Sequence, residues 1–333
     1  MKKNYLRFVV FMSLMLACSG LVYGGGAQPS GSAAKDSAAE YPSRAVSVLV
    51  GMAAGGDTDF NARLTARYLE QFLGQSFPVT NNTGNGGADA ATQVLKSAPD
   101  GYTLGLLATS NATNRASGIT DFSVTDFEVI AIVGKSAGEA LVVRSDFPAN
   151  NVKEFIEYTK ANPFKVNWAA NVGATSHFAG TIANNVYGAQ LNFVSTGATS
   201  QRVVALVGGN VDAICVPAKA MADYVETKQA KYLCMMTSQR VWYLPDLQTA
   251  VEAGYPELYY DPVYYLCAPK GTDPAIVKKL ADACEKMNKT PQYEKEIKDA
   301  YNQWLFFLSG EDARQFAIKE QERYMGYSKY FKK

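Results

Sequence analysis

The sequence has 333 residues, of which 47% are hydrophobic and 19% are charged, so it can bury a substantial core and is predicted to form two lobes. Its 32 basic and 31 acidic side chains nearly balance, and it lacks a basic patch of the kind that binds nucleic acid. We therefore expect no nucleic-acid partner, and an anionic ligand would have to be held by local groups and not by a global field.

Residues 1–17 are predicted to be a signal peptide. A basic start, "MKKNY", precedes the apolar run "LRFVVFMSLMLA", which is too short to span a bilayer comfortably. Cys18 follows in "MLAC", which resembles the bacterial lipoprotein signal, although Met15 stands where leucine is usual. We expect Cys18 to be lipidated; ordinary secretion with cleavage elsewhere is the alternative.

Residues 18–40 are rich in glycine, alanine and serine and lack an apolar period, which is typical of a flexible tether. Such a tether has a root-mean-square reach of about 25 Å. Removal of Lys2, Lys3 and Arg7 with the leader gives the mature chain a net charge of about −2. We expect an exported protein that a lipid anchor holds to a membrane, facing the periplasm or the cell exterior.

From Tyr41 onward, short apolar runs alternate with helical patterns. The strand-like "AVSVLVGM" precedes a helix with Phe60, Leu64, Tyr68 and Phe72 at fourfold spacing, and a glycine follows that helix. The same alternation continues along the chain and predicts an α/β architecture with parallel strands. In such sheets, ligands bind at the carboxyl ends of strands, where helices begin.

Four strand-to-helix junctions share one chemistry: "AAGGDTD" (residues 53–59), "NTGNGGADA" (82–90), "NVGATSH" (171–177) and "STGATSQ" (195–201). Each combines glycine for close backbone approach, small polar side chains and the free N–H groups of a helix start, which can hold an anion without lysine or arginine. Helix N-capping alone is the alternative at each junction. Four glycine-containing copies favour ligand binding, because ordinary caps do not need so much glycine.

The sequence contains no convincing enzyme motif. A dinucleotide fingerprint fails at Asp89, and "GKSAG" (residues 134–138) is followed by the strand-like "EALVV" where a nucleophile elbow needs a helix. The single histidine, His177, is interpreted as a ligand contact or a cap, with general-base work as the alternative. We expect no catalytic residues, no cofactor and no metal site.

Four cysteines follow Cys18 in the chain: Cys215, Cys234, Cys267 and Cys284. The first three lie in apolar, strand-like runs, which predicts buried thiols. An exported protein can form disulfides, and the one pair we consider is Cys215 with Cys234, provided that their strands are neighbours.

Motifs along nearly all of residues 41–330 resemble those of the tripartite tricarboxylate transporter receptors, the Bug family of periplasmic binding proteins. They include "YPSRAVSVLVGMAAGGDTDF", "GATSHFAGTIANNVYGA", "LVGGNVDAI", "LPDLQTAVEAGYPEL" and "YLCAPKGTDPAIVKKL". The resemblance implies a two-lobed, type II-like Venus flytrap that captures a small mono-, di- or tricarboxylate for membrane permease subunits, and we expect a monomer. An exported enzyme and a sensor receptor on the same scaffold are the alternatives.

The resemblance also implies the site residues. Two loops from opposite lobes would hold the carboxylate: Ala54, Gly55, Gly56, Thr58 and Asp59 in one, and Gly173, Ala174, Thr175, Ser176 and His177 in the other. The other two junctions would line the cleft through Asn85, Gly86, Thr196 and Gly197, and the candidate set also includes Ser110, Asn111 and Asp261. The family usually has Pro-Tyr-Lys-Gly where this chain has "VSTG" (residues 194–197), so the resemblance does not identify the ligand.

Two crossings are predicted to divide the chain into lobes. "VIAIVGKSAGEALVVRSD" leaves the first lobe and "YYDPVYYLCAP" returns to it. The first lobe would comprise residues 41–139 and 261–333, with the C-terminal helices packed on it, and the second would comprise residues 140–260. Two hinge strands suit closure around a ligand.

Overall fold

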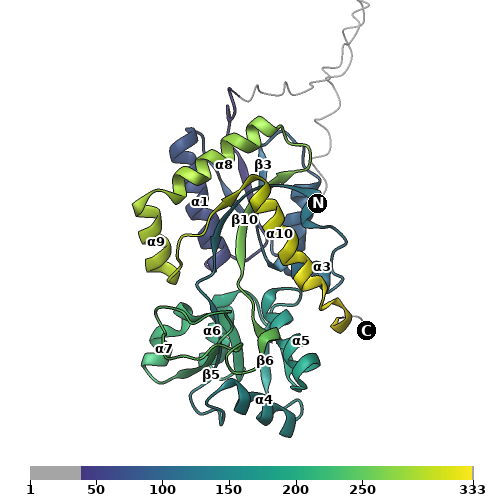
Figure 1. The fold of residues 1–333 in the computed structure, drawn as a ribbon, viewed down its shortest axis with the longest axis vertical. Coiled ribbons are helices and arrows are strands. Elements are labelled where there is room, and N and C mark those ends of the chain that lie inside the picture. Colours follow the sequence, from purple (N-terminus) through teal and green to yellow (C-terminus); the bar gives the residue numbers. More distant parts are fainter. Residues whose placement is uncertain (1–38, 332–333) are drawn as a thin grey trace, which may run out of the picture. The chain divides into compact units, whose positions relative to one another are not determined.

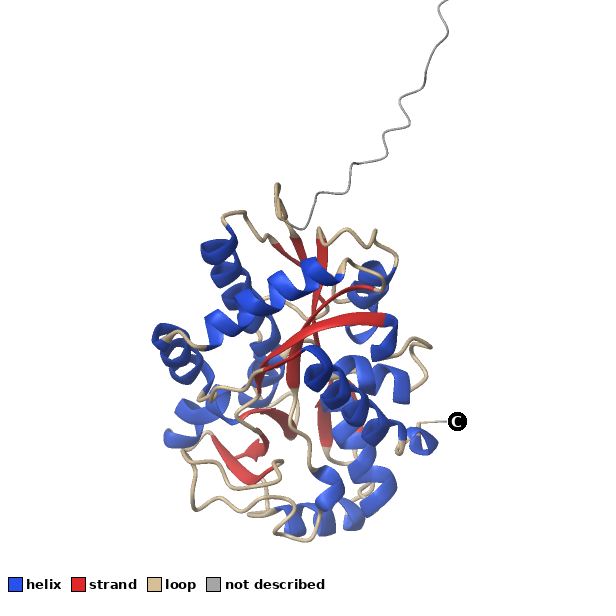
Figure 2. Ribbon diagram, turned by 45° about the horizontal axis from the view of Figure 1, so that its top comes forward, coloured by secondary structure: helices blue, strands red, loops and turns tan. Residues whose placement is uncertain are grey.

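The computed structural model describes residues 39–331, which belong to one compact unit, Asp36–Lys333. The predicted signal peptide, Cys18 and all but the last two residues of the predicted tether lie outside the described residues. Two β-sheets, each covered by helices on both faces, make up the described part (Figures 1 and 2). The prediction of two α/β lobes is confirmed. In the described part, no helix is long and apolar enough to cross a membrane.

The first lobe is built on a six-stranded sheet with the order β11-β4-β10-β3-β1-β2. Strand β1 runs parallel to β2 and β3, whereas β10 runs antiparallel to β3 and β4, so the sheet is mixed and not parallel throughout. The strands are β1 (Ser47–Val50), β2 (Val79–Asn81), β3 (Thr103–Ala108), β4 (Phe127–Lys135), β10 (Val263–Pro269) and β11 (Leu308–Ser309).

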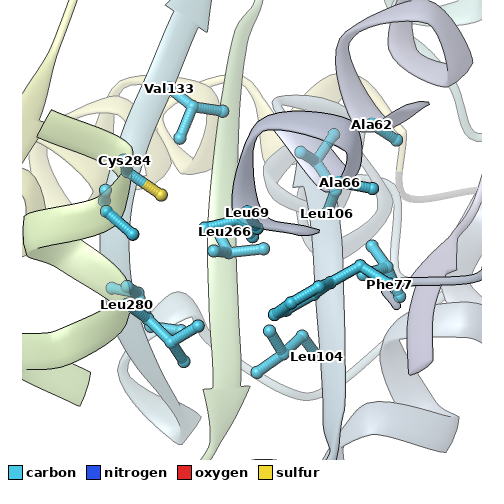
Figure 3. Packing of buried hydrophobic residues seen from close by; sticks show 14 of the residues in the cluster. Ala62, Ala66, Leu69, Phe77, Leu104, Leu106, Val133, Leu266, Leu280 and Cys284 are labelled. Atoms are coloured by element: carbon cyan, nitrogen blue, oxygen red, sulfur yellow. The ribbon is translucent and has the colours of Figure 1, made fainter. Parts of the chain in front are cut away.

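Alternate side chains of these strands enter two separate cores, as the twofold period of a strand requires. Val48 and Val50 of β1 face a core shared with α1, α8 and α9, whereas Leu49 faces a core shared with α2 and α10 (Figure 3 shows part of the first core). The helices are α1 (Asp57–Leu73), α2 (Ala88–Leu95), α3 (Ser110–Ala116), α8 (Pro274–Asn288), α9 (Pro291–Tyr301) and α10 (Gly310–Met325), with short 3₁₀ turns η1 (Gly84–Gly87) and η2 (Val124–Asp126).

The second lobe contains a five-stranded sheet with the order β7-β6-β8-β5-β9. Its strands are β5 (Glu139–Arg144), β6 (Asn167–Ala170), β7 (Asn192–Ser195), β8 (Ala213–Pro217) and β9 (Ala230–Met235). Helices α4 (Val152–Ala161) and α5 (Thr175–Tyr187) cover one face, and α6 (Thr199–Val207) and α7 (Ala222–Glu226) cover the other. Three 3₁₀ turns, η3 (Ala218–Met221), η4 (Pro256–Leu258) and η5 (Ser328–Tyr330), pack on this lobe.

Helix α1 forms where the fourfold apolar spacing predicts it. Leu64, Tyr68 and Leu69 are buried on its inner face, and Gly74 ends the helix in the left-handed conformation (φ 74°), where its N–H donates to Glu70 O at 2.9 Å. Glycine is suited to this position because it has no Cβ to oppose a positive φ.

The chain crosses between the sheets at three places, where two were predicted. It leaves β4 at Lys135 and enters β5 at Glu139, one residue before the predicted boundary, and it returns through residues 260–262 to β10. The third crossing is α10, which runs from the first lobe toward α5 (Figure 1). Tyr324, near its end, is fully buried in the second lobe's core, so the C-terminal segment does not pack on the first lobe alone.

The cysteine pairing that we considered does not fit the sheet. Cys215 on β8 and Cys234 on β9 both lie opposite Leu141 of β5, one on each side of it. They are therefore two strand spacings apart, roughly 9.5 Å, which exceeds the separation that a disulfide can bridge. All four cysteines of the described part are buried and free.

Candidate functional site

A cavity of about 50 Å³ lies between the two lobes, where the first turns of α1, α5 and α6 meet. The carboxyl ends of β1, β6 and β7 lead into these helices, and the short helix α3 begins beside them. The lining residues are Met52, Ala53, Gly56, Asp57, Thr58, Ala108, Thr109, Ser110, Glu139, Asn171, Ala174, Thr175, Ala198, Thr199, Arg202, Pro262 and Tyr264. Three of the four predicted junctions thus contribute to one site.

The first junction brings the start of α1 to the cavity. Gly56 precedes the helix in an extended conformation (φ −91°), and Thr58 in the first turn is buried against the cavity. The first backbone bond of α1 runs from Phe60 N–H to Gly56 O at 2.9 Å, so the N–H groups of residues 57–59 have no partner within the helix. No side chain caps this helix, although a cap is what the alternative interpretation requires.

Asp59 stabilises the first junction from within and does not line the cavity. Its carboxylate accepts hydrogen bonds from Gly55 N–H (3.0 Å), Arg63 Nε (2.9 Å) and Asn81 Nδ2 (2.8 Å). Burial raises the pKa of Asp59, but these hydrogen bonds outweigh burial and hold the pKa below its ordinary value. Gly55 adopts a positive φ of 82° in this turn and, like Ala54, is exposed and does not line the cavity.

The third junction brings the start of α5 from the facing lobe. Ala174 precedes the helix in an extended conformation without a side-chain cap, and Thr175 follows it at the cavity wall. Ser176 turns away, because its hydroxyl accepts from Asn171 N–H at 3.0 Å. His177 also lies outside the lining, where its ring contacts Phe193, and burial lowers its pKa.

The fourth junction contributes through residues that follow the predicted ones. Ala198 and Thr199 at the start of α6 line the cavity, as does Arg202 one turn later, whereas Thr196 and Gly197 do not. The Gly197 carbonyl instead accepts a hydrogen bond from Arg202 Nη1 at 3.0 Å. The N-cap residue of this helix, Ala198, has no side chain that can accept a hydrogen bond, but Gln201 Oε1 accepts from Ala198 N–H at 2.9 Å.

Each of these three helix starts contributes positive potential to the cavity. Each helix presents N–H groups without helical partners, and the macrodipole adds about half a positive charge at each N-terminus. Among the other long helices of the described part, α4 and α8 carry side-chain caps, from Asn151 and Asp273, whereas α9 and α10 do not. The arrangement is chemically suited to an anion that replaces the missing caps.

The second predicted junction serves the contact between the lobes. Gly86 has a φ of 64°, and a Cβ on it would lie 2.6 Å from Val172 O of the second lobe. Its carbonyl accepts from Asn114 Nδ2 at 3.2 Å, and Asn85 bonds Asp89 at 2.8 Å. Gly173 faces the same contact, because its carbonyl accepts from Thr113 Oγ1 at 2.9 Å. None of these residues lines the cavity.

Three further candidates have separate positions. Ser110, a predicted ligand-binding residue, lines the cavity. Asn111 lies over a different, smaller cavity of about 20 Å³, and its Nδ2 donates to Tyr265 OH at 3.3 Å. Asp261 pairs with Lys135 at 2.7 Å beside the crossing strands, so its carboxylate already has a cationic partner. Burial raises the pKa of Asp261, and Lys135 opposes this.

Sequence reasoning missed the charged members of the site. Asp57, Glu139 and Arg202 all line the cavity, together with Tyr264, whose hydroxyl donates to Asp57 Oδ2 at 2.6 Å. A signal was available for Glu139, since it is the one charged residue in the run "AGEALVV". In the described residues, no group of three or more His, Cys, Asp or Glu side chains could hold a metal ion.

Comparisons with known proteins show the family to which the chain belongs. The family model "Tripartite tricarboxylate transporter family receptor" matches residues 61–326. The chain is 32% identical to "UPF0065 protein in gbd 5'region" of Cupriavidus necator over 86% of this chain and 87% of that protein. It is also 32% identical to "Protein BugT" of Bordetella pertussis, over 83% of each chain.

Two solved structures are similar to this chain over most of its length. MatC of Rhodopseudomonas palustris with bound malate has a TM-score of 0.78 and 27% identity, covering 88% of this chain and 100% of that one. Rpa4515 of R. palustris with adipate has a TM-score of 0.79 and 25% identity, and the match covers 87% of this chain and 98% of that one. The two lobes are thus those of a periplasmic binding protein, and the chain belongs to the tripartite tricarboxylate transporter receptor family of solute-binding proteins.

Proposed function

We propose that this receptor captures a small carboxylate in the cavity between its lobes and delivers it to the permease subunits of a tripartite tricarboxylate-type transporter. The observation that carries the proposal is the convergence of three helix N-termini, from α1, α5 and α6, on one cavity, none of which has an N-cap side chain that accepts a helix N–H. A carboxylate oxygen can accept several backbone N–H groups there, and charge-assisted bonds of this kind contribute about 1.5–3 kcal/mol each. The ligands of two similar solved structures, malate and adipate, are of the same class.

The lobes supply the enclosure that such a receptor needs. Gly56 and Thr58 come from the first lobe, and Ala174 and Thr175 come from the second, so the carboxylate would contact both. A ligand held from both sides stabilises the closed arrangement by its differential affinity for it. Because the family consists of solute-binding receptors, we expect the ligand to be released unchanged.

A thermal-shift series tests this function. Mono-, di- and tricarboxylates, including malate and adipate, are each compared with the corresponding amides. A ligand at a hundred times its dissociation constant stabilises the fold by about 2.7 kcal/mol, which raises the melting temperature by several degrees. We expect acids to give this shift and amides not to. A broad acid series without any shift would contradict the proposal.

We also propose that Cys18 carries the lipid that holds the receptor at the membrane. The support is the "MLAC" motif and the glycine- and serine-rich segment that follows it. In cell fractionation, the Cys18→Ala variant should move from the membrane to the soluble fraction. Unchanged membrane association of Cys18→Ala would rule the anchor out, without bearing on ligand binding.

A further inference from the structure

Glu139 is a buried carboxylate at the cavity between the lobes. It begins β5 directly after the crossing from the first lobe, and it is only 4% exposed. Its Oε2 lies 3.9 Å from the Cys215 thiol, which is a weak donor, and it forms no ion pair within the described part of the chain. An ionised carboxylate in such surroundings is costly, whereas the protonated acid is far less so.

The side chains beneath Glu139 do not neutralise its charge. The Cys215 thiol lies 2.8 Å from Tyr260 OH and 3.3 Å from Met236 Sδ, and all three side chains are buried. Burial raises the pKa of Cys215 well above its ordinary value, and the charge of Glu139 raises it further, so the thiol keeps its proton. Burial also raises the pKa of Tyr260. Glu139 therefore lies against neutral groups on this side.

Asp57 brings a second carboxylate to the same cavity from the first lobe. It is the first residue of α1, where the helix dipole favours a negative charge, and its Oδ2 accepts a hydrogen bond from Tyr264 OH at 2.6 Å. Both features favour the ionised form of Asp57. Because two carboxylates that share an enclosed site disfavour each other's charge, a proton goes to the one with weaker donors, which is Glu139.

The wider surroundings of Glu139 act in the same direction. Burial raises the pKa of Glu139 well above its ordinary value of 4.5, and the negative charge of Asp57 raises it further. The positive charge of Arg202 and a hydrogen bond from Tyr260 oppose this rise, and the negative charge of Asp261 adds to it. Three further titratable side chains near Glu139 are tyrosines whose pKa burial raises: Tyr243, Tyr264 and Tyr301.

Arg202 lines the cavity but is not an ion-pair partner of Glu139 in the described part of the chain. Its Nη1 and Nη2 donate instead to Gly197 O (3.0 Å) and Thr199 Oγ1 (3.2 Å), beside the start of its own helix. The positive charge of Arg202 therefore remains available to an anion in the cavity.

The approach of Asp57 to Glu139 depends on closure, because the two residues belong to opposite lobes. When the lobes separate, Asp57 moves away with α1 and water reaches Glu139, and both changes favour the ionised acid. When the lobes close on a carboxylate, the ligand occupies the positive helix starts and adds its own negative charge to that of Asp57. Closure and ligand thus both favour the protonated form of Glu139.

We propose that Glu139 takes up a proton from solvent when the lobes close on a carboxylate, so that the receptor binds its ligand together with a proton. The protonated acid presents an O–H group to the ligand in place of a negative charge. This inference rests on the proposed carboxylate-binding function and adds a dependence on pH to it.

Proton uptake makes ligand affinity highest in acid. Below the open-state pKa of Glu139, the side chain is protonated before the ligand arrives, and binding takes up no proton. As the pH rises from there to the higher closed-state pKa, affinity falls by up to about tenfold per pH unit.

Isothermal titration calorimetry in two buffers measures the proton directly. Malate is the first probe and adipate the second, each titrated into the purified protein at pH 7 in PIPES and in imidazole, whose ionisation enthalpies differ. If neither binds, the acid with the largest thermal shift replaces them. The difference in apparent binding enthalpy should correspond to uptake of about 0.3–1 proton per ligand. This measurement needs no variant and therefore does not depend on the folding of a mutant.

Two variants then assign the proton. Glu139→Gln is a neutral isostere of the protonated acid, so its uptake should fall below about 0.1 proton per ligand. Glu157→Gln, the same change on the exposed face of α4, should take up as many protons as the wild type. Between pH 5.5 and pH 7.5, the affinity of the wild type should fall at least about fivefold relative to that of Glu139→Gln.

The outcomes separate this inference from the proposed function. Binding with less proton uptake than expected in the wild type overturns the inference while the carboxylate receptor stands. Uptake that persists in Glu139→Gln also overturns it, because another group then takes the proton. If no acid of the series binds, the proposed function fails and the inference fails with it.

Discussion

The two glycine-rich loops of the first lobe, residues 53–59 and 82–90, have similar sequences and different tasks. Beside Gly56 there is space, since the nearest atom to an added Cβ, Ala53 O, would be 3.7 Å away. Beside Gly86 there is backbone of the other lobe at 2.6 Å. The first loop therefore opens on the cavity, while the second lets the two lobes approach each other. Glycine composition alone does not distinguish these roles.

The largest effect is expected for Gly86→Ala. The new Cβ would collide with Val172 O, and the residue would keep a left-handed conformation, so we expect a loss of roughly 2–4 kcal/mol in the free energy of unfolding. A melting temperature lower by about 5–10 °C would report it.

Gly118→Ala is the matched control, because Gly118 has a similar φ of 71° and no atom within 4 Å of an added Cβ. Gly118→Ala should lose only the free energy that a left-handed conformation costs a residue with a Cβ, about 1–2 kcal/mol. Equal losses in the two variants would show that the contact between the lobes does not constrain Gly86.

Gly56→Val should remove ligand binding while leaving the fold intact. Gly56 has a negative φ, so a side chain is tolerated by the backbone, but it would occupy the space through which a carboxylate reaches the α1 N–H groups. We expect loss of the ligand-induced stabilisation of about 2.7 kcal/mol, read as an absent thermal shift. Normal binding by Gly56→Val would mean that this glycine serves the turn alone.

Asp59→Ala should destabilise the loop of residues 53–59 without blocking the cavity. Removal of the carboxylate leaves Gly55 N–H and Asn81 Nδ2 without their acceptor, which we expect to cost about 2 kcal/mol. The pKa of Asp59 is lower in the folded state than in the unfolded state. The stability that its carboxylate contributes is therefore present above the unfolded-state pKa of 3.8 and is lost as the pH falls through the folded-state pKa.

Urea unfolding between pH 3 and 7 measures this difference. The wild type should exceed Asp59→Ala by a constant margin above about pH 5, and the margin should shrink in acid. A margin that grows in acid would contradict the role of the carboxylate as an acceptor.

The smallest effect is expected for His177→Ala. The imidazole contacts the Phe193 and Phe331 rings at centroid distances of 5.3 and 6.0 Å, so its loss should cost about 1 kcal/mol. Burial lowers the pKa of His177, so the stability that it contributes is present above the unfolded value of 6.5 and declines as the pH falls through the folded value.

Chemical denaturation at pH 5 and pH 7.5 tests this, with ligand affinity measured alongside. Affinity should fall far less in His177→Ala than in Gly56→Val. Conversion of a bound acid that disappears in His177→Ala would instead support the enzyme alternative.

Much of the fold could be predicted because its signals are local. The apolar run of β1, the fourfold spacing in α1 and the glycine at residue 74 each act within a few residues of one another. The direction of β10 was not predictable in this way, since it runs antiparallel to β3 only because the chain returns from the other lobe. Nor does a local pattern reveal that α10 ends with Tyr324 in the second lobe's core.

For the site, the sequence by itself determined which junctions have the chemistry to hold an anion: glycine, small polar side chains and a helix start at 53–59, 82–90, 171–177 and 195–201. Only the tertiary structure decided which of these meet, and that Asp59 and Asp261 are engaged elsewhere. It alone brought Glu139 and Arg202, 63 positions apart, to one cavity. The physical reason is that helix starts depend on neighbouring residues, whereas the burial and pairing of a charge depend on segments that meet only after both sheets have formed.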